Sequence, residues 1–149
     1  MDHAGRRDRL RAALPDVDAL LVTSLTNTRY LTGFTGSHGA VLVTASAGDD
    51  RLGTDFRYVT QVETECPGIE VVVDRNAGQA LAAYAVSLGI VRLGIEAEHL
   101  TVAARDALAT AQPALELVPL VGSVEALRIE KDDDELAAVA EACRISDSA

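Results

Sequence analysis

Residues 40–73 read AVLVTASAGDDRLGTDFRYVTQVETECPGIEVVV and combine a hairpin, a helix and a further strand. Two short apolar segments, 40–44 and 51–54, flank the turn SAGDD, a pattern typical of a β-hairpin. Apolar residues at helical spacing predict a helix over residues 55–65, which the sequence CPG ends. The apolar run at 69–73 then predicts another strand.

The alternation of strands and helices continues on both sides of this run. A short helical turn, beginning at Ser24 or Asn27, extends through Tyr30-Leu31. The remaining predicted elements are helices at 4–14, 78–88 and 101–111, and strands at 19–23, 91–96 and 115–120. We therefore expect an α/β fold, with a mixed, mostly parallel β-sheet that has one antiparallel pair and is flanked by helices.

The composition limits the kinds of partner. The 149 residues carry a formal net charge of −10, and so acidic a surface repels nucleic acid. The clustered Arg6, Arg7, Arg9 and Arg11 either bind an anion or form the solvated face of the first helix, and we favour the solvated face. The two cysteines form no disulfide framework, and neither a signal peptide nor an apolar run of membrane-spanning length is present, so we expect a cytoplasmic protein without a membrane partner.

Gly33, Gly36 and Gly39 form a G-x-x-G-x-x-G series that resembles a phosphate-binding loop. A phosphate loop follows a strand and opens a helix, whereas these glycines lead into the predicted strand at 40–44. We therefore interpret the glycines as structural, in a tight turn that requires positive φ.

The sequence offers no clear catalytic or metal-binding motif. His3, His38 and His99 are scattered, and the acidic run 132–135 lacks the spacing and the glycine of a calcium loop. That run is better explained as the start of a helix. We therefore assign no catalytic residue and no metal ligand to this chain.

The most specific local feature is the sequence DFRY at residues 55–58. The Asp55 carboxylate is suited to cap the following helix. Arg57 lies in the first helical turn, where the helix dipole disfavours a cation, so it either pairs with Asp55 or faces a ligand carboxylate. We favour the pairing with Asp55.

The last 18 residues, DDDELAAVAEACRISDSA, predict an amphipathic helix that Asp132 or Asp133 caps. Its apolar side consists of Leu136, Val139, Ala140 and Cys143. No other predicted element covers this stripe, which indicates a partner surface in a missing domain or in another subunit.

Three blocks of sequence resemble the creatinase/prolidase N-terminal domain family. The run NTRYLTGFTGSHGAVLVT at 27–44 is similar to the family's N-x-x-Y-L-T-G-F-x-G-S signature, and LGTDFRYVTQVETE at 52–65 is similar to its T-D-x-R-Y-x-x-Q segment. The run EALRIEKDDDELAAVAEACRISD at 125–147 resembles the R-x-x-K-x-x-x-E-[IL] junction with the catalytic domain. The residues that match this junction are Arg128, Lys131, Glu135 and Leu136.

This resemblance implies that residues 1–124 are the N-terminal domain of an Xaa-Pro aminopeptidase or prolidase. Residues 125–149 would then be the linker and first helix of a truncated catalytic domain. In the family that domain holds two divalent metal ions, usually manganese, cobalt or zinc, which activate a water for attack on the peptide bond before proline. Because the chain stops before the metal ligands of the family, we expect it to be inactive alone.

The resemblance also implies a homodimer in which N-terminal domains contact the catalytic domain and help to wall the cleft for the peptide substrate. By position, the substrate-proximal candidates are Tyr30, Phe34, His38, Arg57 and Tyr58. Arg57 would suit a substrate carboxylate, and Phe34 or Tyr58 would either pack on the prolyl ring or fill the core, the second being favoured. Two alternatives remain open, namely the N-terminal domain of a creatinase-like amidinohydrolase and a stand-alone interaction domain.

Overall fold

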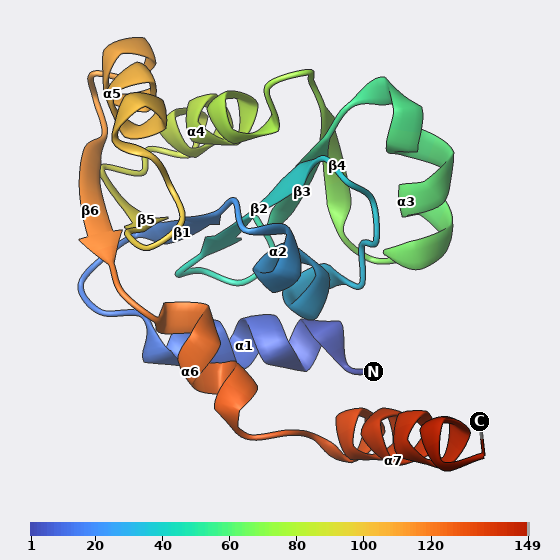
Figure 1. Ribbon diagram of the computed structural model, residues 1–149. Coiled ribbons are helices and arrows are strands. Elements are labelled where there is room, and N and C mark those ends of the chain that lie inside the picture. Colours follow the sequence, from blue (N-terminus) through green and yellow to red (C-terminus); the bar gives the residue numbers. More distant parts are fainter. Residues whose placement is uncertain (149) are drawn as a thin grey trace.

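The computed structural model describes residues 1–148, which form a single six-stranded sheet covered by helices on both faces (Figure 1). The strands are β1 (Ala19–Val22), β2 (Gly39–Thr44), β3 (Arg51–Thr54), β4 (Glu70–Val73), β5 (Arg92–Glu96) and β6 (Glu116–Leu120). The helices are α1 (His3–Ala13), α2 (Leu25–Thr32), α3 (Val59–Glu65), α4 (Ala77–Ser87), α5 (Val102–Ala111), α6 (Ser123–Ile129) and α7 (Asp133–Asp147). The expected α/β class, a mixed and mostly parallel sheet flanked by helices, is therefore confirmed.

The strand order in the sheet is β4-β3-β2-β1-β5-β6, and only β2 runs against the others. The predicted hairpin of β2 and β3 is confirmed, but the expectation of one antiparallel pair is wrong, because β2 is antiparallel to β1 as well. The reason is the short α2. It does not return the chain to the amino end of β1, so β2 starts at the carboxyl end of β1 and runs backward beside it.

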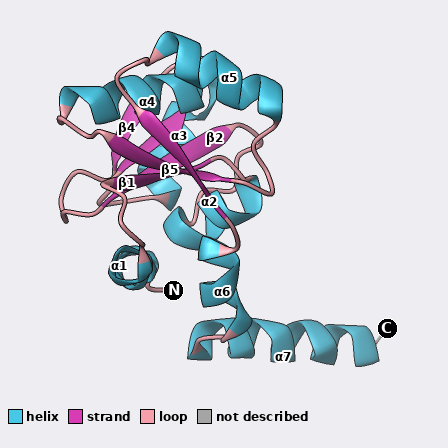
Figure 2. Ribbon diagram, turned by 90° about the vertical axis from the view of Figure 1, so that its left-hand side faces the viewer, coloured by secondary structure: helices cyan, strands magenta, loops and turns pink. Residues whose placement is uncertain are grey.

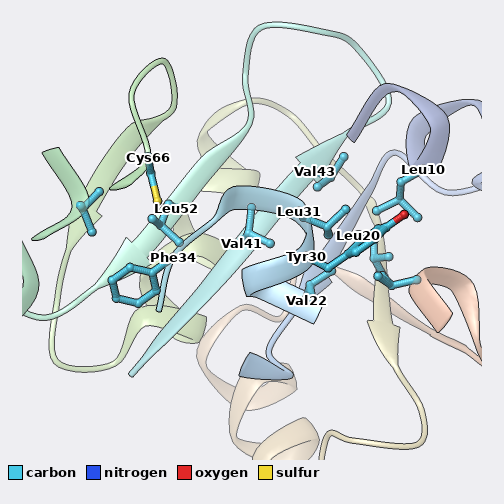
Figure 3. Packing of buried hydrophobic residues seen from close by; sticks show 12 residues of the cluster. Leu10, Leu20, Val22, Tyr30, Leu31, Phe34, Val41, Val43, Leu52 and Cys66 are labelled. Atoms are coloured by element: carbon cyan, nitrogen blue, oxygen red, sulfur yellow. The ribbon is translucent and has the colours of Figure 1, made fainter. Parts of the chain in front are cut away.

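Alternate residues of the central strands enter two separate cores. In β1, Leu20 and Val22 face the core under α1, α2 and α6, whereas Ala19 and Leu21 face the core under α4 and α5. Figure 3 shows the first core, with Leu31 of α2 packed among the strands. Burial of each such Leu or Val contributes about 1.5–3 kcal/mol, so both faces of the sheet are stabilised by aliphatic side chains.

Two helical segments differ from the prediction, although the first of them begins after Ser24, as one of the two alternatives had it. The short turn predicted from Ser24 or Asn27 through Tyr30-Leu31 is a full helix, α2, which ends at Gly33 in the left-handed conformation with φ 85°. The segment predicted as one helix over 55–65 opens with a 3-10 turn at Phe56–Tyr58 before α3 begins. Asp55 caps this turn, because its carboxylate accepts the backbone N–H of Arg57 at 3.0 Å, and the predicted cap is confirmed.

The arginines of α1 are not the solvated face that we favoured. Arg11 donates from Nη2 to both carboxylate oxygens of Asp50 at 3.0 and 2.9 Å, and Arg7 donates from Nε to the same group at 3.0 Å. Arg6 is also buried. Of these four arginines, Arg9 alone is exposed. The sequence pattern did not reveal the ion pairs with Asp50 that attach α1 to the sheet.

The last two helices differ in how they relate to the sheet. α6 packs on the first core through Val124 and Leu127, whereas α7 extends away from the rest of the molecule (Figure 2). Asp132 caps α7 as predicted, in a reciprocal capping box with Glu135. Leu136, Val139 and Ile145 of α7 are all more than half exposed. Within residues 1–148, no helix is long and apolar enough to span a bilayer.

Candidate functional site

Two of the sequence blocks meet at the carboxyl edge of the sheet. The loop at 33–39 leads into β2 and the turn at 55–58 follows β3, and Thr54 Oγ1 donates a hydrogen bond of 2.6 Å to the carbonyl of His38 between them. We call residues 33–39 and 55–58 together the glycine-loop site. Open α/β sheets bind ligands preferentially at this edge, which makes it the candidate functional site.

The glycines of this loop have two different structural roles. Gly33 has the predicted positive φ and ends α2. Gly36 and Gly39 do not have positive φ, so our expectation is wrong for them. They are needed instead for space, because a Cβ on Gly36 would overlap the Phe34 ring and one on Gly39 would lie 2.8 Å from Phe34 Cε1.

The aromatic pair Phe34 and Tyr58 joins the two halves of the site. Their rings meet edge-to-face with centroids 5.6 Å apart, a favourable aromatic geometry. Phe34 is only 1% exposed, whereas Tyr58 is half-buried and its hydroxyl lies 2.6 Å from Ser37 Oγ. The core-packing alternative therefore describes Phe34, and Tyr58 is the member of the pair that reaches the surface.

Asp55 and Arg57 form the most strongly charged feature of the site. Arg57 donates from Nε and Nη2 to the Asp55 carboxylate, at 3.0 Å to Oδ1 and 2.6 Å to Oδ2. These hydrogen bonds lower the pKa of Asp55 to about 2, so the carboxylate stays ionised at neutral pH. The Arg57 side chain is nevertheless 59% exposed, so the pairing that we favoured leaves the outer part of its guanidinium accessible.

The remaining candidates separate into two places. His38 is half-buried in the loop, and its Nε2 makes no hydrogen bond within residues 1–148. Tyr30 lies in the first core, 7% exposed, and its hydroxyl donates to the carbonyl of Leu127 in α6 at 3.2 Å. The structure thus places Arg57 and Tyr58 side by side at the surface, with Phe34 packed against Tyr58. His38 lies in the loop that Thr54 binds, and Tyr30 lies at the α6 contact.

A pocket of about 640 Å³ opens next to the glycine-loop site. Its walls include Ser37 and His38 from the loop, Asn76 and Gly78 at the start of α4, and His99 after β5. Hydroxyl, amide and imidazole groups line it together with small apolar residues, and its volume is in the range of small-ligand pockets. It extends the candidate site from β3 across to β5.

The sequence did not reveal a buried polar network behind this pocket. Asn27, which is fully buried, donates from Nδ2 to Glu96 at 2.7 Å and to Glu125 at 2.5 Å, and its carbonyl oxygen accepts from Arg128 at 3.0 Å. Glu96 also accepts the backbone N–H groups of Thr23 and Ser24. The available signal was a Glu as the last residue of the strand β5, since such a carboxylate is buried only when it is hydrogen-bonded.

The described residues do not fit a metal centre. No three His, Cys, Asp or Glu side chains converge within residues 1–148 in a way that could hold a metal ion.

Comparison with known proteins identifies the family of the chain. Residues 6–129 match the creatinase/prolidase N-terminal domain, which is most of the chain. The chain belongs to this family. The glycine loop and the DFRY turn, which resemble segments of the family, both lie within the matched residues, and the fold places them at one edge of the sheet.

Relatives of this creatinase/prolidase N-terminal domain are peptidases. The N-terminal domain of the cytoplasmic peptidase PepQ from Mycobacterium tuberculosis H37Rv is 45% identical, with a TM-score of 0.80 over 83% of this chain and 98% of that one. An Xaa-Pro dipeptidase from Bacillus anthracis is 34% identical, with a TM-score of 0.88 over 98% of this chain and 41% of that one. The curated relative "Uncharacterized peptidase YqhT" of Bacillus subtilis (strain 168) is 37% identical over 134 residues, 89% of this chain and 37% of that protein. The domain thus spans well under half the length of the last two.

Proposed function

We propose that this domain is the non-catalytic N-terminal part of a proline-specific metallopeptidase, an Xaa-Pro aminopeptidase or dipeptidase, in which it helps to wall the substrate cleft and to form the subunit interface of a homodimer. The observation that carries the proposal is the match of 98% of the chain to 41% of an Xaa-Pro dipeptidase. The rest of such a peptidase has the length of a separate catalytic domain. A cytoplasmic location agrees with the name of the PepQ relative.

The catalytic domain in this proposal follows α6. The predicted boundary at residues 124/125 falls inside this helix, which packs on the core through Val124 and Leu127. We therefore place the junction after Ile129, where the family match also ends, and assign α7 to the catalytic side. The expected pair of manganese, cobalt or zinc ions would lie on that side, because the described part of this chain offers no ligand cluster.

The part of the domain that would face substrate is the glycine-loop site. Arg57 is suited to a peptide carboxylate, because a guanidinium already oriented by Asp55 loses little conformational freedom on binding. Tyr58, whose ring lies 5.3 Å from the Arg57 guanidinium, would offer an apolar edge for a prolyl ring, and His38 a further polar contact. Phe34 would support this surface from below.

The first test is activity. A polypeptide that continues from this domain through a catalytic domain should hydrolyse Xaa-Pro peptides in the presence of manganese, and the 149-residue chain should not. Hydrolysis of creatine in place of peptides would support an amidinohydrolase parent. Peptide turnover by the 149-residue chain, or a gene that ends without a catalytic domain, would refute the proposal.

The second test is Arg57→Ala in that longer polypeptide. Loss of one charged contact to the substrate carboxylate is expected to lower kcat/KM by about tenfold. The matched control is Arg105→Ala, which removes another exposed arginine, on α5, that pairs with its neighbour Asp106. If Arg57→Ala lowers the melting temperature but leaves the kinetics normal, Arg57 serves only the ion pair with Asp55.

A further inference from the structure

A single buried arginine connects the first helix to the last. Arg6 lies on α1 and is only 2% exposed, yet its guanidinium reaches the start of α7, 126 residues later in the sequence. Its Nε and Nη2 donate to Asp132 Oδ2 at 3.2 and 2.5 Å, and Nη2 lies 3.3 Å from Glu135 Oε2.

The two carboxylates that bind Arg6 are also the cap of α7. Asp132 uses its other oxygen, Oδ1, to accept the backbone N–H of Glu135 at 2.9 Å, and Glu135 accepts the backbone N–H of Asp132 at 3.1 Å. This reciprocal capping box fixes the first turn of α7. Arg6 therefore contacts the helix at its capped first turn.

On its other side Arg6 is fixed to the sheet domain. Its Nη1 donates to the carbonyl of Tyr30 at 3.1 Å, and its guanidinium carbon lies 4.2 Å from the centre of the Tyr30 ring. Tyr30 in turn bonds through its hydroxyl to Leu127 of α6. A buried guanidinium is stable only when its donors are satisfied, so Arg6 has few alternative positions.

Beyond its first turn, α7 makes little contact with the sheet domain. None of the residues of α7 is buried, and the apolar Leu136 and Val139 are exposed. One other ion pair joins α7 to the amino-terminal segment, between the Met1 amino group and Asp134 Oδ2 at 2.7 Å, but both groups are exposed, at 41% and 61%, and an exposed pair contributes little. The direction in which α7 leaves the sheet domain thus depends mainly on the buried contact of Arg6 with Asp132 and Glu135.

We propose that Arg6 is a positioning residue, which fixes the orientation of α7 relative to the sheet domain through the capping carboxylates Asp132 and Glu135. If the proposed function holds, this contact also sets how the catalytic domain that follows α7 is placed over the glycine-loop site. The orientation of α7 itself is a property of the chain described here and can be measured without any activity.

The experiment uses residual dipolar couplings of backbone amides in the 149-residue chain. The couplings of α7 and of the sheet should fit one common alignment tensor in the unmodified chain. Asp132→Asn removes the charge but keeps a good N-cap, so α7 should stay helical by its Cα shifts while it loses the alignment that it shares with the sheet. Arg6→Gln should give the same loss. Because Asp132 is the more exposed partner, Asp132→Asn remains informative if Arg6→Gln does not fold.

The matched control is Glu141→Gln, which breaks the exposed ion pair of Glu141 with Arg144 inside α7. It should leave the common alignment intact. Couplings of α7 that are unchanged by Asp132→Asn, or that already fail to fit the tensor of the sheet in the unmodified chain, would overturn the proposal. Either result would leave the peptidase assay unaffected, and an inactive longer polypeptide would leave the orientation measurement unaffected.

Discussion

Asp55 has two structural roles before α3, as a helix cap and as the partner of Arg57. Its carboxylate caps the 3-10 turn before α3 and holds Arg57 in place, although Asp55 is only 5% exposed. A buried carboxylate is tolerated here because each of its oxygens accepts a hydrogen bond from Arg57. The same bonds give the residue its low pKa, so its contribution to the stability of the domain should depend on pH.

We therefore predict a specific loss of stability in acid. Because the folded-state pKa of Asp55 is about 2, below the ordinary value of about 3.9, its stabilising effect is complete above pH 4 and is lost as the pH falls toward 2. Asp55→Asn keeps the cap but has no charge to lose. The free energy of unfolding, measured by urea titration from pH 5 to pH 2, should fall less steeply for Asp55→Asn than for the unmodified chain.

Asp106→Asn is the control for this comparison, since Asp106 is exposed and pairs only with its neighbour Arg105. Its profile should follow that of the unmodified chain. Hydrogen bonds also lower the pKa values of Asp18, Glu65 and Asp132. The stability that these three carboxylates lose in acid is the same in all three proteins. Identical slopes for Asp55→Asn and the unmodified chain would show that the bonds with Arg57 do not stabilise the fold.

At the scale of elements, α1 is attached to the sheet by charges as well as by its apolar face. Leu10 supplies the apolar contact. The Asp50 carboxylate, just before β3, accepts hydrogen bonds from both Arg7 and Arg11. Asp50 also accepts the backbone N–H of Thr44 at 3.0 Å, so one carboxylate joins the helix to both strands of the hairpin. Both arginine side chains are nearly buried, at 12% and 13% exposed.

Removal of this carboxylate should therefore be costly. Asp50→Ala removes the carboxylate that two nearly buried guanidinium groups share, and breaking a buried ion pair in this way costs about 3 kcal/mol of unfolding free energy. Urea denaturation measures this cost, and amide exchange should show that α1 opens most. Asp8→Ala is the matched control, because Asp8 also pairs with Arg11 but is 72% exposed, and it should cost at most about 1 kcal/mol. Equal costs for the two variants would contradict this description of α1.

At the scale of the whole molecule, the sequence predicted what depends on local pattern. The apolar runs of the strands, Gly33 at the end of α2 and Asp55 as a cap are all readable within a few residues. The antiparallel pairing of β2 with β1 was missed, because it depends on the position in space at which α2 ends. The contacts of Arg6 with Asp132 and of Asn27 with Glu96 were also missed, since no local spacing reveals a partner that lies far along the sequence.

The same limit explains how the candidate site was predicted. His38, Arg57 and Tyr58 were predicted to lie near substrate because their segments resemble a family, and that role stays a prediction. The position of both segments at one edge of the sheet follows from the pairing of β2 with β3. Tyr30 lies in the same block as His38 but enters the core, because α2 turns its side chain toward α6. A shared sequence block therefore does not place residues on a shared surface.

The exposed apolar face of α7 gives the last prediction. Leu136 is 54% exposed in this chain, so Leu136→Ala should change the unfolding free energy of the 149-residue chain by less than about 0.5 kcal/mol. If the catalytic domain covers α7, the same substitution in the longer polypeptide creates a cavity and should cost about 2–5 kcal/mol. Ala138→Ser, a change at another exposed position of α7, should be nearly neutral in both proteins. A cost as small in the longer polypeptide as in the short one would mean that the following domain does not cover this face of α7.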